Sequence, residues 1–316
     1  MNHFSEQVTR RQCLALLAGA SAAALAPKLC RAASDRNLLL LAISTDTLAG
    51  VNIVDARASY LALINQYNSV QGGKVSCEVV PGVFISSSEI LRDVRQGTVE
   101  CFGVTAVEYA KLIDLVDPET LVLQDYLADG IQYVLVVHKN SSFKKIADLR
   151  GAQVLTHRHR DLVMAPCWLE TMLAGMNLPR SERFFGSISS RDSISQVVLP
   201  VFFRRADAAI LSSRSWATAA ELNPQLGHDL QISAVSPRVV PIAIGFRRNC
   251  NPIGRKLLLE SMLNVTNTVA GRQMAALYQA NGFARRPISI MAGTLEIVRE
   301  SERLSAQQTG PRNKRP

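Results

Sequence analysis

Residues 141–161 read SSFKKIADLRGAQVLTHRHRD, and this stretch decides the fold class. Residues 146–156 predict a short helical turn, a glycine and a strand, in that order. Residues 157–161 then form a polar loop that contains two histidines, two arginines and an aspartate. In an open α/β sheet, ligands bind beyond the carboxyl ends of the strands. This loop is therefore the first place to look for a binding site.

The segments on either side of this stretch alternate between strand and helix patterns. Upstream, strand-like apolar runs at 37–44, 74–82 and 99–105 are separated by helix-like segments at 54–70 and 86–99. Downstream, the pattern predicts a helix at 167–179, a helix and a strand across 193–211, extended chain at 229–249, and helices at 252–283 with a break near Gly271. Such alternation predicts parallel strands with helices on both faces.

We therefore predict an α/β fold of two lobes, each a mostly parallel sheet flanked by helices. Lobe 1 is expected at 34–129 and 234–298, and lobe 2 at 130–233. Two chain crossings, near 125–133 and 231–240, would form a hinge between them. The loops after the strands of both lobes would then surround one cleft.

The two ends of the chain are basic and are expected to lie outside this fold. The net charge of +9 is concentrated there, with four basic residues against one acidic residue in 1–32, and five against two in 299–316. A basic balance of this kind gives no reason to expect nucleic acid as a partner. Residues 299–316 are predicted to be a disordered tail.

The N-terminus, residues 1–33, has the pattern of an export signal. Arg10 and Arg11 precede a short core rich in alanine and leucine, which resembles a twin-arginine signal peptide. Small residues predict cleavage near Ala32, and the mature chain is expected in the periplasm. An uncleaved membrane anchor is the alternative.

The stretch 141–161 resembles a Ser…Asp-Leu-(Lys/Arg)-Gly element of periplasmic substrate-binding proteins. More narrowly, it resembles the phosphate/phosphite/phosphonate-binding group associated with ABC importers. The segments VRQGTVECFGVTAVEYAKL, SISQVVLPVFFRRADAAIL and ISAVSPRVVPIAIGFRRN resemble further elements of the same group. The resemblance implies a two-lobed binder that closes around a small polar ligand, and it implies no enzyme activity and no cofactor.

The resemblance also suggests which residues contact the ligand, together with two departures. Relatives place hydroxyl groups and backbone N–H groups in the loop after Asp-Leu-(Lys/Arg)-Gly, and a Ser-His pair before a later helix. This chain has residues 156–161 and 190–192 in those places. Tyr109 and Asp207 match an aromatic and an acidic position, and Thr45 and Thr105 stand at strand ends. The predicted ligand-binding residues are Thr45, Thr105, Tyr109, Thr156, His157, Arg158, Ser190, Arg191, Asp192 and Asp207.

The polar loop admits three interpretations. His157 and His159 project to one side of an extended segment, as metal ligands do, but no spacing selects a third ligand, so we predict no metal site. Arg158, Arg160 and Arg191 each offer a planar donor set that suits an oxyanion. The third interpretation is a solvated basic loop in which Asp161 or Asp192 pairs locally.

Together, these patterns predict an exported solute-binding protein that captures a small anionic ligand for an ABC importer. The ligand could be a phosphonate, a phosphate ester, or another oxyanion or carboxylate. The partners would be that solute and an ABC permease. Two alternatives keep the fold: a periplasmic ligand sensor that acts on a membrane sensor kinase, and a metal-dependent periplasmic enzyme.

Overall fold

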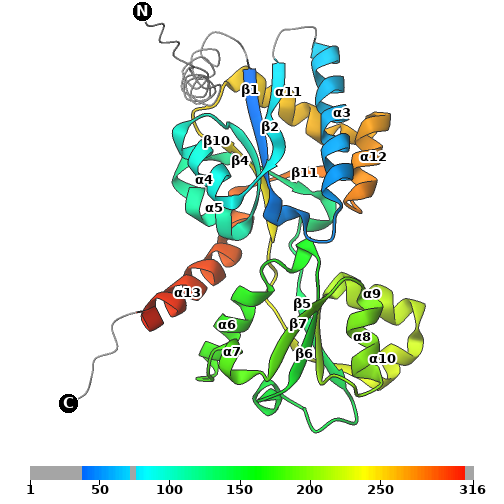
Figure 1. The fold of residues 1–316 in the computed structure, drawn as a ribbon. Helices are drawn as coiled ribbons and strands as arrows, with labels where there is room; N and C mark the ends of the chain where they lie inside the picture. Colours follow the sequence, from blue (N-terminus) through cyan, green and yellow to red (C-terminus); the bar gives the residue numbers. More distant parts are fainter. Residues whose placement is uncertain (1–37, 72–75, 310–316) are drawn as a thin grey trace, which may run out of the picture.

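A computed structural model describes residues 38–71 and 76–309. The strands form two sheets, one in each of two lobes that lie end to end (Figure 1). Lobe 1 has the order β11-β4-β10-β3-β1-β2, and lobe 2 has the order β7-β6-β8-β5-β9. The lobe-1 strands are β1 (Leu38–Ser44), β2 (Ser76–Ile85), β3 (Cys101–Thr105), β4 (Val116–Gln124), β10 (Ile242–Arg247) and β11 (Phe283–Arg286). The lobe-2 strands are β5 (Tyr133–His138), β6 (Gln153–His157), β7 (Ser187–Arg191), β8 (Ala208–Ser212) and β9 (Leu230–Val235).

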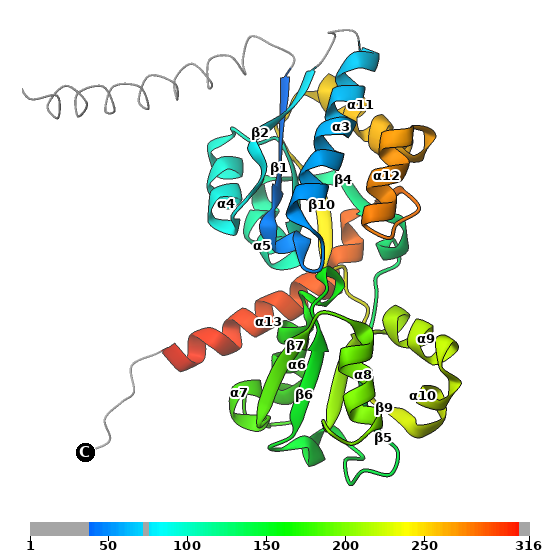
Figure 2. The same ribbon diagram turned by 45° about the vertical axis from the view of Figure 1, so that its right-hand side comes forward.

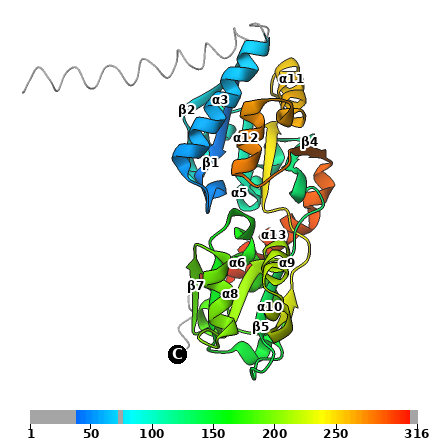
Figure 3. The same ribbon diagram turned by 90° about the vertical axis from the view of Figure 1, so that its right-hand side faces the viewer.

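Helices cover both faces of each sheet. In lobe 1 they are α3 (Ile53–Gln71), α4 (Ser87–Gln96), α5 (Ala106–Leu112), α11 (Pro252–Leu263) and α12 (Val269–Leu277). In lobe 2 they are α6 (Ala165–Gly175), α7 (Ser181–Phe184), α8 (Ile194–Phe202), α9 (Ser213–Leu222) and α10 (Pro224–Asp229). Figure 1 shows α4 and α5 on one face of the lobe-1 sheet and α3, α11 and α12 on the other, and in Figure 3 the face with α3 and α12 is turned toward the viewer. The helix break predicted near Gly271 lies earlier, between Leu263 and Val269.

The strands β1, β3, β5 and β8 are apolar along their length because each lobe buries both faces of its sheet. In β1, Leu41 and Ile43 belong to the core under α3, α11 and α12, whereas Ala42 belongs to the core on the opposite face. In β5, Val134 and Val136 likewise face one core and Leu135 the other. One core cluster contains residues of both lobes, so the lobes share packing on that face.

The sheets are mixed, so the prediction of mostly parallel sheets is wrong in this detail. Parallel pairing joins β3-β1-β2 and β7-β6-β8, but β5 and β10 run antiparallel to both of their neighbours. Each of these two strands follows a crossing from the other lobe. It must therefore start at the hinge and run away from it, whereas β1, β3, β6 and β8 run toward the hinge.

Two crossings connect the lobes, one between β4 and β5 and the other between β9 and β10. They contact each other through a bridge in which Ile131 and Val239 exchange backbone hydrogen bonds of 2.8 Å. The Ser236 hydroxyl also accepts from the Tyr133 N–H at 2.7 Å. The predicted boundary at 234 falls inside β9, which ends at Val235. The hinge is therefore a pair of hydrogen-bonded segments near 125–132 and 236–241.

The C-terminal region differs from its prediction. Helix α13 spans Ala292–Thr309, so the prediction of a disordered tail is wrong for residues 299–309. Leu295 and Val298 are buried in the core shared by both lobes, and Figure 2 shows α13 leaving lobe 1 and running beside lobe 2. The apolar residues of α13 lie on one face of the helix, which packs against the core. The overall composition of the segment, which is polar and charged, does not reveal this arrangement.

The predicted signal peptide, residues 1–33, lies outside the described residues, as do residues 310–316 of the predicted tail. Within residues 38–71 and 76–309, no helix is both long and apolar enough to span a membrane.

Candidate functional site

Two loops from opposite lobes meet at the mouth of the cleft. The η1 turn (Thr45–Leu48) follows β1, and the η5 turn (Arg160–Leu162) follows β6. The N–H of Arg160 donates to the Ala49 carbonyl at 2.9 Å. Gly50 has φ +83°, and a Cβ there would lie 3.1 Å from the Arg158 carbonyl oxygen. A glycine is needed at this position because it allows both the backbone conformation and the close approach.

A cavity of about 240 Å³, which we call the lobe-2 pocket, opens beside this contact. Four predicted residues line it: Thr156, His157 and Arg158 from the end of β6, and Ser190 from β7. β6 and β7 pair in parallel with Thr156 opposite Ser190, so their hydroxyl-bearing ends lie side by side. Ala49 of lobe 1 also lines this pocket, which places the opposite lobe at its rim.

The first turn of α6 forms another wall of the lobe-2 pocket, through Ala165 and Pro166. Proline suits this position because its missing N–H lies among the groups that have no partner within the helix. No side chain caps α6, whereas α4, α5, α8 and α9 begin at serine or threonine caps. The N-terminus of α6 therefore borders the pocket, and the positive end of a helix dipole favours an anion nearby.

His157 and His159 stack with their ring centroids 5.2 Å apart and their planes at 17°. Burial lowers the pKa of both histidines, and for His159 the neighbouring Asp161 opposes this shift. The Nδ1 atom of His157 is buried and has no hydrogen-bond partner among the described residues. Within the same residues, no three histidine, cysteine, aspartate or glutamate side chains form a group that could hold a metal ion. The two rings therefore form part of the pocket wall, with the Nδ1 atom of His157 buried behind its surface.

These shifts predict a loss of stability in acid. Because burial lowers both pKa values from about 6.5, the unfolded chain binds protons that the folded protein does not. The free energy of unfolding should therefore fall as the pH drops below about 6.5. Urea unfolding between about pH 8 and about pH 5 measures this fall. The double variant His157→Gln/His159→Gln should lose less stability over that range than the wild type, and an equal loss in both would contradict the assignment.

A second cavity, which we call the lobe-1 pocket, has a volume of about 610 Å³ and shares Ala49 and Val163 with the lobe-2 pocket. The two pockets are therefore adjacent parts of one cleft. The predicted residues Thr45 and Thr105 line the lobe-1 pocket, together with Asp46, Glu108 and Lys111. Burial, reinforced by Glu108, raises the pKa of Asp46. Two carboxyl groups here oppose binding of an anion, so the two pockets differ in electrostatic character.

Thr105 also has a structural role. Its side chain caps α5 by accepting from the Glu108 N–H at 3.4 Å, and its N–H and hydroxyl donate to Glu108 Oε2 at 2.8 and 2.9 Å. The Ser44 hydroxyl donates to Glu108 Oε1 at 2.5 Å. This buried network joins the ends of β1 and β3, and so fixes the lobe-1 wall of the cleft.

Arg191 and Asp192 lie at the rim of the cleft. The Arg158 Nε atom lies 3.2 Å from Asp192 Oδ1, in an ion pair whose side chains are 61% and 80% exposed. Arg191 is exposed, and its Nη1 donates to the Ser190 carbonyl at 2.9 Å. Exposed ion pairs of this kind contribute little stability, so Arg158 can turn toward a ligand at small cost.

Tyr109 and Asp207 lie away from the cleft, which corrects their expected roles. Tyr109 is fully buried in the core, so no ligand in the cleft can reach it. Asp207 accepts from the Gln153 N–H at 2.7 Å, at the start of β6, whereas the pockets lie beyond the end of that strand. Asp207 therefore links the N-terminal ends of β6 and β8, which lie at the opposite end of the strands from the cleft.

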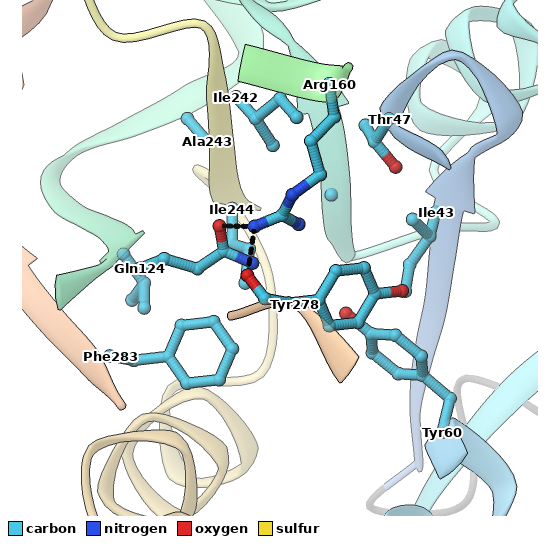
Figure 4. A pocket seen from close by; sticks show the side chains of 12 residues that line it. Ile43, Thr47, Tyr60, Gln124, Arg160, Ile242, Ala243, Ile244, Tyr278 and Phe283 are labelled. Atoms are coloured by element: carbon cyan, nitrogen blue, oxygen red, sulfur yellow. Dashed lines mark hydrogen bonds between the residues drawn. The ribbon is translucent and has the colours of Figure 1, made fainter. Parts of the chain in front are cut away.

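Arg160, which the sequence pattern offered as an anion ligand, points elsewhere. Its side chain is only 2% exposed and lies in a small cavity of lobe 1, between Gln124 and Tyr278 (Figure 4). Ala49, Val163 and Lys111 were not predicted as lining residues. Lys111 lies in α5, directly after β3, and Val163 follows η5, which comes after β6. Only their position beyond the ends of strands that reach the cleft could have identified them.

The geometry agrees with comparisons to known proteins. A sequence profile described as an ABC transporter, phosphonate, periplasmic substrate-binding protein matches residues 73–286. A sequence search against curated proteins found no match. Similar structures include the binding component of a phosphonate ABC transporter from Pseudomonas aeruginosa, with 12% identity over 87% of this chain and 90% of that one, and TM-score 0.53.

Two further structures share the fold. PhnD1 from Prochlorococcus marinus, in complex with methylphosphonate, has 16% identity, covers 84% of this chain and 98% of its own, and gives TM-score 0.53. A Xanthomonas citri protein bound to ATP has 14% identity, with 85% and 98% covered and TM-score 0.57. At these identities the structures establish the two-lobed fold, and the family follows from the profile, which spans more than half of the 316 residues. The chain therefore belongs to the family of periplasmic substrate-binding proteins of phosphonate ABC transporters.

Proposed function

We propose that this chain is an exported solute-binding protein that captures a small anionic ligand by hinge closure and delivers it to an ABC permease. One observation carries the proposal: the uncapped N-terminus of α6, the hydroxyl side chains of Thr156 and Ser190, and Arg158 border one pocket, with the opposite lobe at its rim. Helix N–H groups, hydroxyls and a guanidinium are all donors, so together they favour an oxyanion or a carboxylate.

The ligand's anionic group is assigned to the lobe-2 pocket and the remainder of the ligand to the lobe-1 pocket. Thr156, Ser190 and Arg158 would donate to the anion, and the ring of His157 would contact it as part of the pocket wall. Thr45 and Thr105 would contact the ligand from lobe 1. Asp192 would act from the rim by holding Arg158 when no ligand is bound, whereas Arg191 would stay bonded to the Ser190 carbonyl and would not contact the ligand. The relatives solved with methylphosphonate and with ATP both hold phosphorus oxyanions, which supports this ligand class.

Closure between two lobes supplies the binding mechanism. A ligand that contacts both lobes binds the closed arrangement more tightly than the open one, and so shifts the population toward closure. Residues 1–33 are proposed as the export signal that delivers the chain to the periplasm, where its family acts. The role is binding and delivery rather than catalysis.

The Arg158→Ala variant tests the proposed anion site. A thermal-shift panel of methylphosphonate, phosphate, phosphate esters, sulfonates and carboxylates first identifies an anion that raises the melting temperature. Calorimetry should then show that Arg158→Ala weakens binding of that anion by about 10- to 100-fold, because one charged hydrogen-bonding group is worth about 1.5–3 kcal/mol.

Arg191→Ala is the matched control. It removes an arginine from the same rim, but one whose side chain bonds to its neighbour's carbonyl. Its affinity should stay within about threefold of wild type, the change expected for one exposed charge. If Arg158→Ala binds the anion as tightly as the wild type does, Arg158 is not a ligand of the anion.

A further inference from the structure

Arg160 connects the two lobes with its side chain. Its backbone belongs to η5 of lobe 2, yet its guanidinium is buried in lobe 1, inside a cavity formed by Gln124 and the rings of Tyr60 and Tyr278 (Figure 4). Gln124 ends β4 and Tyr278 follows α12, so both belong to lobe 1. No other interlobe contact described above buries a charge in this way.

Neutral groups of lobe 1 and of the first crossing accept hydrogen bonds from one nitrogen of the guanidinium. Its Nη2 donates to Gln124 Oε1, to the Tyr126 hydroxyl at 2.6 Å and to the Tyr278 carbonyl at 3.1 Å. Its central carbon lies 4.5 Å from the centre of the Tyr278 ring, a cation–π distance. A delocalised guanidinium suits such a site because it is less strongly hydrated than an ammonium group.

The negative charge nearest to this network is the carboxylate of Asp161, which is linked to Arg160 by the Tyr126 hydroxyl. The Tyr126 hydroxyl, which accepts from Arg160, donates to Asp161 Oδ1 at 2.8 Å. Asp161 is 4% exposed, and its own carbonyl accepts from the Tyr133 hydroxyl at 2.6 Å. Two neighbouring residues of the polar loop are therefore anchored on the hinge, and opening the lobes would separate Arg160 from its lobe-1 partners.

We propose that Arg160 is an interlobe latch that positions the ligand loop. These contacts join protein to protein, so they favour the observed arrangement of the lobes, in which the two cleft loops are in contact, whether or not a ligand is bound. They also place Arg158 and His157, which precede Arg160 on the same loop, against the rim formed by Ala49. The positioning role rests on the proposed function, whereas the latch itself does not.

Small-angle X-ray scattering of the ligand-free protein tests the latch. Arg160→Ala should shift the radius of gyration to a larger value than wild type, because the lobes lose the contacts that hold them together. Arg160→Lys should shift it in the same direction, since an ammonium group keeps the charge but not the planar donor geometry. Arg191→Ala, which removes an exposed arginine from the same cleft rim, should leave it unchanged.

Two milder variants keep the test decisive if Arg160→Ala does not fold. Gln124→Leu and Tyr126→Phe each remove one acceptor of Arg160 with little change in volume, and each should also enlarge the radius of gyration. If all folded variants keep the wild-type radius, the latch is ruled out. Because no ligand is used, a failure of every anion to bind would contradict the proposed function and leave the scattering result standing.

Discussion

Replacing Glu108 by alanine is expected to lower the free energy of unfolding by about 3 kcal/mol, since it leaves several buried donors unsatisfied. Glu108 is 2% exposed and accepts from the Ser44 hydroxyl, the Thr105 N–H and the Thr105 hydroxyl. Ser44 and Thr105 are themselves buried. The same substitution should loosen the lobe-1 wall of the cleft, because this network joins the ends of β1 and β3.

Glu89→Ala is the matched control for Glu108→Ala. Glu89 occupies the equivalent position in the capping box of α4, where it accepts from the Ser86 N–H and hydroxyl on an exposed surface. Water can replace those bonds, so the expected loss is at most about 1 kcal/mol. Urea unfolding measures both variants, and a shift in midpoint at constant slope reports stability alone. Equal losses at the two sites would show that burial does not set the cost.

Gly271→Ala is expected to cost about 2–3 kcal/mol through overpacking. A Cβ at Gly271, in the first turn of α12, would lie 1.8 Å from the Val265 carbonyl oxygen and 2.6 Å from its carbon. Both atoms are backbone, so no side-chain rotation relieves the clash and α12 must move. Because Tyr278 follows α12 and its carbonyl accepts from Arg160, this movement should also weaken the contact between the lobes.

Gly175→Ala provides the comparison for Gly271→Ala. Gly175 is the last residue of α6, and a Cβ there would have no neighbour within 4 Å. Alanine should leave stability unchanged or raise it by up to about 1 kcal/mol, because it restricts the unfolded chain. Melting temperatures of the two variants give the test. A similar decrease in both would mean that the Val265 contact is not the cause.

Much of the fold follows from local patterns in the sequence. The segment IADLRGAQVLTH forms the predicted turn and strand, η4 (Ile146–Leu149) and β6, because its apolar spacing and its glycine at φ +76° both favour that local structure. The helices α4 and α5 begin where serine and threonine can cap them. The polar edge strands β7 and β11 were not predicted, because short strands that bury little surface leave no apolar pattern to detect.

The candidate site was predictable to the extent that topology positions it. Thr45, Thr105, Thr156 and Ser190 stand at or beside the ends of strands that run toward the hinge, and the structure places all four in one cleft. Tyr109 and Asp207 were selected by family resemblance alone. A matching residue type does not indicate whether the side chain is buried in the core or faces the cleft, and both of these side chains lie outside the cleft.

Hydrogen bonds and apolar spacing within a few residues control most of the alternation of strands and helices, the helix caps and the loops that face the cleft, so these features can be predicted from the sequence. The roles of Arg158 and Arg160 depend instead on contacts between segments that are distant in the sequence. These arginines are two residues apart in one polar loop, yet one is exposed at the rim and the other is buried in the opposite lobe. The difference comes from Gln124 and Tyr278, which lie 36 and 118 residues away in sequence and meet Arg160 only when the two lobes come together.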